Sequence, residues 1–363
     1  MMRILRRYYL GEFLKLFLIL SLGLSSVFSL IDLVNKIDDF IPYKPSAWDL
    51  LRYAALLFPG YLLYLLPMAA LMSGLFVVGQ AGRKKETVAI KTAGGRLKAL
   101  FMPFVLFGIL LSIASFVIGE FLVPDLSKKA NRLRDSITRK EQTTTFQAGA
   151  GWMRTRDFII KTDLCIPDSG VIKGISIMRI RDDMLIERIE AESAEWHPAW
   201  GSDPQTKGAW FLSGVTLYDV GTGTVKKFTV YPTDVIDAPR SLGKGMQKPE
   251  EMTMRDLFAY TKRLKEAGIK NIKLTVDIYA RLSYPLINFI MLILGVSLAA
   301  RGEQKSGLMI MAVGICVSVL YWFGYTASLS LGYTGILPPL LAAWLVPAVF
   351  GIGTMYLFQR IPE

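Results

Sequence analysis

Apolar residues in this chain are gathered into six long runs, at 13–34, 51–78, 97–123, 276–300, 308–330 and 338–358. Each run has about 20 residues or more and few charges, which is the length that an α-helix needs to cross a bilayer. The first run is too long for a signal peptide and lacks a small-residue cleavage site, so we expect it to remain uncleaved. The pattern predicts a polytopic α-helical membrane protein with six transmembrane helices.

The polar insert at 124–273 has a different periodicity. Its short runs are rich in β-branched and aromatic residues: GWMRTRDFIIKTDL, GVIKGISIMRI, MLIERIEAESAEW, AWFLSGVTLYDV and VKKFTVYPTDV. Turn clusters such as IPDSG and GTG separate these runs, which predicts an all-β domain of the sandwich, jellyroll or open-barrel type. The segment TMRDLFAYTKRLKEAG then predicts a flanking amphipathic helix, with Thr253 as its N-cap and Gly268 as its stop.

The chain is strongly basic, with a net charge of +12, and the termini and short loops on one side of the predicted spans carry more cations than the short loops on the other side, where Lys36 and Lys44 lie among three aspartates. The cations of the first side precede the first span, follow the sixth, and fill the loops after the second and fourth: Arg3, Arg6, Arg7, Arg83, Lys84, Lys85, Lys91, Arg96, Lys98, Arg301, Lys305 and Arg360. The positive-inside rule therefore predicts that both termini are cytoplasmic and that the insert lies across the membrane. We expect no nucleic-acid partner, because the insert has no basic stripe or base-stacking motif.

Motifs for catalysis are missing from the sequence. It has no phosphate-binding loop, and its single histidine, His197, allows neither a catalytic triad nor a metal site at ligand spacing. Cys165 and Cys316 belong to different predicted regions and are not expected to pair. Asp277 and Arg281 can form an i,i+4 pair at the start of the fourth span, with either a structural or a functional role. We expect a non-catalytic protein without cofactors or metals, for which another protein supplies energy.

The loop between the second and third spans carries the segment GRKKETVAIKTAGGRLK. We expect a short cytoplasmic helix at 83–94, ended by Gly94 and the glycine that follows it. Glu86 is its single acid, and Arg83 is the only cation spaced to pair with it locally. On spacing alone, Glu86 is either a helix-start acid that stabilises the helix dipole or the charge that fixes the register of a helix docked in a partner's groove.

GRKKETVAIKTAG resembles the R-x-x-E-x-x-x-x-x-x-(S/A)-G coupling segment of the lipopolysaccharide export permeases, the LptF/LptG family. Further similar segments follow in the family's order: LLPMAAL, GEFLVPDLSKKANRLR, YTKRLKEAGIKNIKLTVDIYARLSYPL and GILPPLLAAWLVPAVFGI. The resemblance covers nearly all 363 residues, and the segment around Pro338 and Pro339 is more similar to LptG than to LptF.

The resemblance implies an inner-membrane heterodimer with an LptF-type sibling permease, each subunit having six spans and a periplasmic β-jellyroll. An LptB-type ATPase dimer would bind beneath, and lipopolysaccharide would pass to an LptC-type single-span protein and a periplasmic LptA-type bridge. Glu86 falls on the position of the acid that meets the ATPase, and we expect Arg83, Ala89 and Ile90 to share this coupling role.

The resemblance also bears on the substrate site. Where some members carry lysines that face the lipid phosphates, this sequence has Asp32 and Gly60. We therefore expect phosphate contacts at Lys36, Arg132 and Arg134, although cations here could also snorkel to the membrane surface. Acyl chains would follow an apolar face of the jellyroll, for which the candidates are Phe158, Ile160, Ile175, Ile177, Leu212 and Phe228; the alternative is a plain β-domain core.

Other readings of the layout remain open. An LptF-type sibling subunit is the nearest alternative. Mechanotransmitting permeases of the MacB or LolC/LolE kind also have a large outside domain, but with four spans and the domain in the first loop. A receptor would need a cytoplasmic output domain, and an enzyme would need a reactive constellation of side chains.

Overall fold

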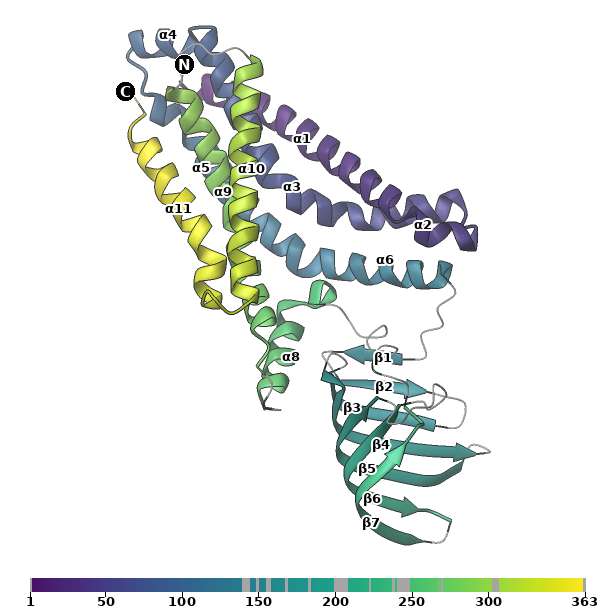
Figure 1. Cartoon of the computed structure of the whole chain (residues 1–363). Coiled ribbons are helices and arrows are strands. Elements are labelled where there is room, and N and C mark those ends of the chain that lie inside the picture. Colours follow the sequence, from purple (N-terminus) through teal and green to yellow (C-terminus); the bar gives the residue numbers. More distant parts are fainter. Residues whose placement is uncertain are drawn as a thin grey trace. The chain divides into compact units, whose positions relative to one another are not determined.

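The computed structural model describes residues 2–138, 144–147, 150–154, 158–166, 169–181, 184–198, 208–221, 223–236, 239, 249–266, 268, 270–301 and 307–361. The chain divides into two compact units. The helical unit comprises Met1–Thr138 and Ile272–Glu363, and the β-unit comprises Arg139–Asn271. Figure 1 shows the elements of both units, coloured along the sequence.

The helical unit contains long apolar helices joined by short ones. Its elements are α1 (Met2–Asn35), α2 (Ile37–Phe40), η1 (Ile41–Tyr43), α3 (Ala47–Arg83), α4 (Glu86–Thr92), α5 (Leu97–Val117), η2 (Ile118–Leu122), α6 (Val123–Ile137), α9 (Ile272–Arg301), α10 (Gly307–Tyr333) and α11 (Pro339–Gln359). Among the described residues, six helices are long and apolar enough to cross a membrane, which confirms the predicted spans.

The third span differs from its prediction because the helix continues beyond position 123. It runs through η2 and α6 to Ile137, and α6 belongs to the helical unit rather than to the insert that was expected to begin at 124. The reason is packing: Ala130 of α6 is fully buried against Phe40 and Tyr53. In η2 the amide of Val123 donates to the carbonyl oxygen of Ile118, so this turn contains one residue more than an α-turn.

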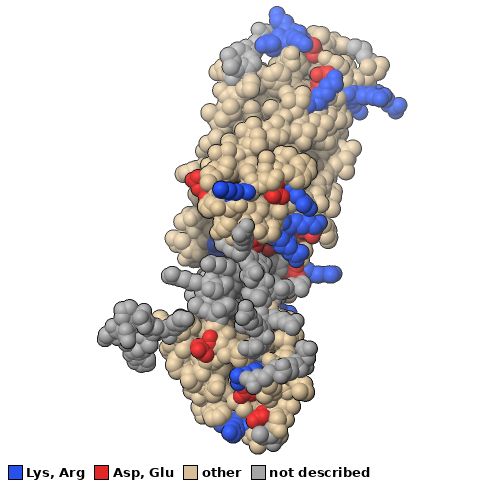
Figure 2. Space-filling model, turned by 90° about the vertical axis from the view of Figure 1, so that its right-hand side faces the viewer, with Lys and Arg blue, Asp and Glu red and all other residues tan. Residues whose placement is uncertain are grey.

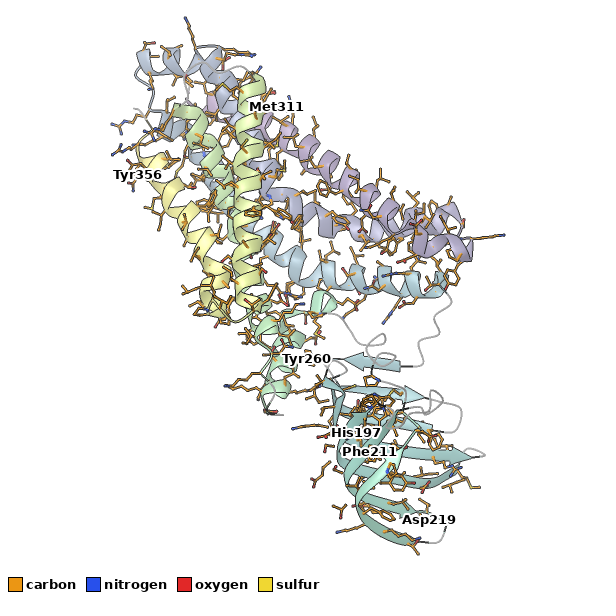
Figure 3. The ribbon with its side chains drawn as sticks, in the orientation of Figure 1. His197, Phe211, Asp219, Tyr260, Met311 and Tyr356 are labelled. Atoms are coloured by element: carbon orange, nitrogen blue, oxygen red, sulfur yellow. The ribbon has the colours of Figure 1, made fainter. Side chains whose placement is uncertain are left out.

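Helices α3 and α9 form the centre of the helical unit. In their most apolar windows 67% and 61% of residues are buried, against 22% for α1. Small residues allow close contact: a Cβ on Gly295 would lie 2.5 Å from the carbonyl oxygen of Leu71. Outer helices leave apolar side chains exposed, such as Met311 of α10 and Tyr356 of α11, which point outward in Figure 3. Figure 2 shows a band of the helical unit without Lys, Arg, Asp or Glu, as lipid contact requires.

The described strands of the β-unit form a seven-stranded antiparallel sheet. Its strands are β1 (Thr144–Gln147), β2 (Ala150–Arg154), β3 (Phe158–Ile166), β4 (Val171–Arg181), β5 (Met184–His197), β6 (Ala209–Asp219) and β7 (Thr224–Thr233). Each strand pairs with the next in sequence, so the described order is a meander. The sheet domain is confirmed, although β1 was not predicted. The jellyroll arrangement stays a prediction.

One apolar face of this sheet is maintained across a kink. In β6 the buried positions are Trp210 and Leu212 before Gly214, and then Val215 after it, so the alternation shifts by one residue. Gly214 and Gly174 of β4 have φ values of +65° and +62°, a conformation that side chains with a Cβ rarely adopt. A similar one-residue shift occurs in β5, and in β3 the alternation ends in three consecutive buried residues. The shift keeps apolar residues from both halves of the strands in one core cluster.

The predicted flanking helix is present as α8 (Met254–Glu266), after the short η4 (Pro249–Glu251). The backbone amide of Asp256 donates to Thr253 Oγ1 at 3.3 Å, which confirms Thr253 as the N-cap. Beyond its end, Gly268 adopts a φ of +81°. Leu257 and Leu264 are buried.

Candidate functional site

Two backbone joints define α4, the short helix that carries Glu86. At its start, Lys85 is left-handed, with a φ of +56°, which ends α3 and redirects the chain. At its end, the amides of Gly94 and Gly95 donate to the carbonyls of Lys91 and Ile90 at 2.9 and 2.8 Å. This is a Schellman arrangement with Gly94 at φ +76°. A Cβ on Gly95 would lie 2.9 Å from the Ile90 carbonyl oxygen, so this position requires glycine.

Helix α4 has one face turned into the unit and one exposed face. Ile90 is 7% exposed and packs in a cluster with Tyr9, Phe13 and Leu97. Glu86 lies one turn earlier on this side and is half-buried, whereas Ala89 is exposed. Of the residues predicted to meet an ATPase, Ile90 is therefore placed to anchor α4 rather than to reach a partner.

The Glu86 carboxylate is held by a residue that sequence reasoning did not identify. Tyr9 of α1 donates from its hydroxyl to Glu86 Oε2 at 2.6 Å. Arg83, the cation spaced to pair locally, is exposed, and within the described part of the chain no ion pair joins it to Glu86. The contact spans 77 positions. Periodicity places Tyr9 and Phe13 on one face of α1, but no local signal connects Tyr9 to α4.

A groove of about 320 Å³ opens beside this contact, between α1, α3 and α4. Most of its polar lining comes from side chains outside the predicted set: Tyr8, Tyr9, Glu12, Lys15, Gln80 and Lys84. Glu12 accepts a hydrogen bond from Lys15 at 2.9 Å on the exposed side of α1. The groove thus has two carboxylates, Glu12 and Glu86, and two cations, Lys15 and Lys84, and Glu86 is held by a neutral hydroxyl rather than by a cation. Such a groove can receive a polar or cationic side chain.

The predicted phosphate-binding cations lie at the far end of α3. Lys36 Nζ is 2.8 Å from Asp32 and lies over the Tyr53 ring. Arg134 of α6 makes a 2.6 Å ion pair with Asp39 of α2. The structure therefore brings Lys36 and Arg134 to the same small region around α2, each beside an acid.

Arg132, the third predicted cation, is exposed on α6, and Gly60 has room for a Cβ, with Val123 at 3.9 Å as its nearest neighbour. At the start of α9, Tyr333 donates a hydrogen bond to Asp277 Oδ1 at 2.7 Å. This contact from α10 was not predicted. The contact between Asp277 and Arg281 stays a prediction, with either a structural or a functional role.

The residues proposed for the acyl-chain path share one apolar face of the β-unit. Four of them are buried in its core cluster: Ile160, Ile175, Ile177 and Leu212. Phe158 packs against this cluster, whereas Phe228 is 39% exposed on β7. Their position is compatible both with a lipid path and with an ordinary core.

Cys165 lies in the same β-unit core and is fully buried. Burial raises the pKa of the Cys165 thiol to about 12, so it stays protonated and unreactive at neutral pH. Both cysteines are free, as predicted. The rings of His197 and Phe211 pack edge-on with their centroids 4.9 Å apart. The two residues are labelled near one another in Figure 3. Among the described residues, no group of three or more His, Cys, Asp or Glu could hold a metal ion.

Known proteins resemble this chain in sequence over nearly its whole length. The family model described as "Lipopolysaccharide export system permease LptF/LptG" matches residues 7–360. The chain belongs to the LptF/LptG family. As a family member with six apolar helices, it is a lipopolysaccharide export permease, a transporter subunit that crosses the inner membrane several times.

Individual relatives agree with this membership. The chain is 23% identical over 369 residues to the lipopolysaccharide export system permease protein LptG of Escherichia coli (strain K12), and the match covers 97% of each chain. It is 20% identical over 321 residues to the protein of the same name from Haemophilus influenzae, covering 84% of this chain and 81% of that one. The LptF/LptG resemblance inferred from the motifs is therefore confirmed.

Proposed function

We propose that this permease is the LptG-type subunit of an ABC transporter that extracts lipopolysaccharide from the inner membrane and passes it to a periplasmic bridge. Its partners would be an LptF-type sibling, an LptB-type ATPase dimer, an LptC-type single-span protein and an LptA-type bridge. The observation that carries the proposal is α4, a short helix with one anchored face, one exposed face and a carboxylate beside a polar groove.

In this proposal the ATPase docks on α4 and the groove. Glu86 would accept a charge-assisted hydrogen bond from a cation of the ATPase, because the Tyr9 hydroxyl donates to only one of its two oxygens. Arg83 and Ala89 are exposed beside it and would complete the contact. Ile90 would transmit the movement, since its side chain is fixed among α1 and α5 residues.

The charge distribution supports an orientation with α4 in the cytoplasm. Both termini and α4 lie at the same end of the helical unit in Figure 1. Figure 2 shows Lys and Arg side chains at that end, and further ones, with Asp and Glu among them, at the opposite end of the helical unit. The positive-inside rule would then place both termini in the cytoplasm and the β-unit in the periplasm.

Lipopolysaccharide is a phosphorylated amphiphile, so its site needs cations beside an apolar surface. Lys36, Arg132 and Arg134 would bind the phosphates where α2 and α6 meet. The apolar face of the β-unit would then shelter acyl chains, with exposed Phe228 at its margin. Asp32 and Asp39 would have to release their cations for phosphate to bind.

The LptG assignment rests on the names of the relatives and on the Pro338 segment. An LptF-type subunit is the alternative. Expression in cells depleted of either native subunit would separate the two: we expect growth to be restored in place of LptG and not in place of LptF. The opposite pattern would establish the LptF type.

Co-purification tests the transporter assignment. A tagged chain, extracted in mild detergent, should bring down a six-span sibling and a small soluble ATPase. After reconstitution in proteoliposomes, that complex should release lipopolysaccharide to the LptA-type bridge only with ATP. A chain that purifies alone, or a complex that hydrolyses ATP without any release, would contradict the proposal.

Cysteine labelling tests the orientation. Thr92→Cys on α4 and Val220→Cys on the β-unit are both at exposed positions, and Cys165 and Cys316 would be replaced by serine. A thiol reagent that does not cross the inner membrane should label Val220→Cys in intact cells, and Thr92→Cys only after permeabilisation. The reverse pattern would overturn the topology.

A further inference from the structure

Tyr9 is the residue outside the predicted coupling set that touches Glu86. Its ring is 5% exposed and belongs to the core cluster that contains Phe13 and Ile90. Its neighbour Tyr8 contacts it edge-on at 5.4 Å and is itself 53% exposed. The Tyr9 ring is thus packed in the helical unit while its hydroxyl reaches the groove.

Helix α4 depends on side-chain contacts for its position. It has 7 residues, too few to be stable as an isolated helix, and it is bounded by left-handed Lys85 and Gly94. Two contacts tie its inner face to the rest of the unit: the packing of Ile90 and the hydrogen bond from Tyr9. Apolar packing has little directional preference, whereas a hydrogen bond of 2.6 Å fixes both distance and direction.

The chemistry of the donor is also informative. A cation beside Glu86 would neutralise its charge, but a tyrosine hydroxyl holds one oxygen and leaves the negative charge in place. Glu86 Oε1 can then accept a bond from a cation in the groove. The other side of the contact is α1, which packs against α3 and α5 through Phe13 and Phe17, so the hydrogen bond joins α4 to a helix that is itself part of the core.

We propose that Tyr9 is a positioning residue for coupling: it orients the Glu86 carboxylate toward the ATPase and links movements of α4 to α1. This inference rests on the proposed ATPase contact at α4. The hydroxyl is needed to orient the carboxylate, because the packed ring alone has no donor for it.

The test compares Tyr9→Phe with Tyr356→Phe in the full complex with sibling and ATPase, because Tyr356 is 51% exposed on α11 and does not line the groove. Tyr9→Phe keeps the buried ring and removes only the donor, so the complex should still assemble and should lose no more thermal stability than one hydrogen bond provides. Lipopolysaccharide released per ATP hydrolysed should fall about tenfold, as expected for one hydrogen bond to a charged group. Tyr356→Phe should retain the wild-type ratio.

Two further measurements separate positioning from general structure. In a Glu86→Gln background, Tyr9→Phe should cause no further loss, because Tyr9 acts through the carboxylate. Spin labels at Ile4 of α1 and Val88 of α4, both exposed, should give a narrow distance distribution that broadens with Tyr9→Phe and not with Tyr356→Phe.

The outcomes keep the two proposals distinct. If the wild-type complex exports lipopolysaccharide and Tyr9→Phe matches it in ratio and distance distribution, Tyr9 has no positioning role and the proposed function stands. If Tyr9→Phe loses thermal stability as much as coupling, or adds its full loss to that of Glu86→Gln, the role is structural and the inference is wrong. If the wild-type chain does not bind an ATPase, the proposed function itself fails.

Discussion

The two ends of the helical unit hold their carboxylates with different partners. Beside α4, Glu86 accepts a hydrogen bond from the neutral hydroxyl of Tyr9. Around α2, Asp32 and Asp39 are each paired with a cation, Lys36 and Arg134. Helix α3 joins the two regions, and its 37 residues correspond to a length of about 55 Å.

The difference matters for what each end can bind. A carboxylate oriented by a neutral donor keeps its charge available to a cationic partner, without first breaking an ion pair. A cation that already has an acid beside it must exchange partners before it can bind a phosphate. The α4 end is therefore preorganised for its partner, whereas binding at the α2 end requires rearrangement.

Reversing the charge of Glu86 should cause the largest loss of function at the α4 end. Glu86→Lys removes the acceptor for Tyr9 and adds repulsion toward the proposed cation of the ATPase. Truncating one member of such a pair costs about 2–5 kcal/mol, so ATPase co-purification and growth should be lost. Glu86→Ala should be milder, and Lys91→Ala on the same helix is the control. A Glu86→Lys variant that assembles and exports normally would reduce Glu86 to a helix-start acid.

A backbone change tests whether the α4 end depends on its close fit. Gly95→Ala places a methyl group 2.9 Å from the Ile90 carbonyl oxygen and should cost about 1–3 kcal/mol. Gly82→Ala is the matched control, because a Cβ there meets nothing within 4 Å in a helix that favours alanine. The temperature of thermal unfolding and the amount of co-purified ATPase should both fall for Gly95→Ala and stay unchanged for Gly82→Ala. Equal behaviour of the two variants would mean that α4 tolerates displacement.

The smallest effect is expected at the α2 end. Asp39→Asn releases Arg134 from a pair in which the two side chains are 55% and 29% exposed, and exposed pairs contribute about 0–1 kcal/mol. Stability should hardly change, while lipopolysaccharide affinity should rise up to about fivefold at low salt. Titration with lipopolysaccharide in detergent measures this, with Asp38→Asn as the control. Unchanged or lower affinity would argue against Arg134 as a phosphate ligand.

Elements with strong periodicity could be predicted from the sequence. The six spans, the later strands and the capped helix α8 follow from apolar run length, alternation and capping residues. The glycine stop after α4 at Gly94 could also be predicted, because left-handed C-terminal caps favour glycine, whereas the predicted start at 83 was wrong because left-handed Lys85 separates Arg83 of α3 from α4. Each of these signals acts over a few residues.

The contacts that give the site its chemistry could not be predicted in this way. The Tyr9–Glu86 bond joins residues 77 positions apart, and Arg134–Asp39 joins residues from different helices. Such contacts depend on how helices pack against one another, and the local patterns of a single sequence do not reveal that packing. Likewise the third span was predicted to end at 123, where the apolar run ends, although Ala130 of α6 packs into the helical unit.

The wide turn η2 has a consequence for how this chain is compared with its relatives. Each residue rotates an α-helix by about 100°, so the additional residue in η2 sets the direction in which every side chain of α6 points. A relative that lacks this residue would present a different face of α6 to α2 while having nearly the same sequence there. Arg134 faces Asp39 because η2 sets this rotation of α6 about its axis. At 20–23% identity, aligned cations in α6 are equivalent only when the turn before them has the same number of residues.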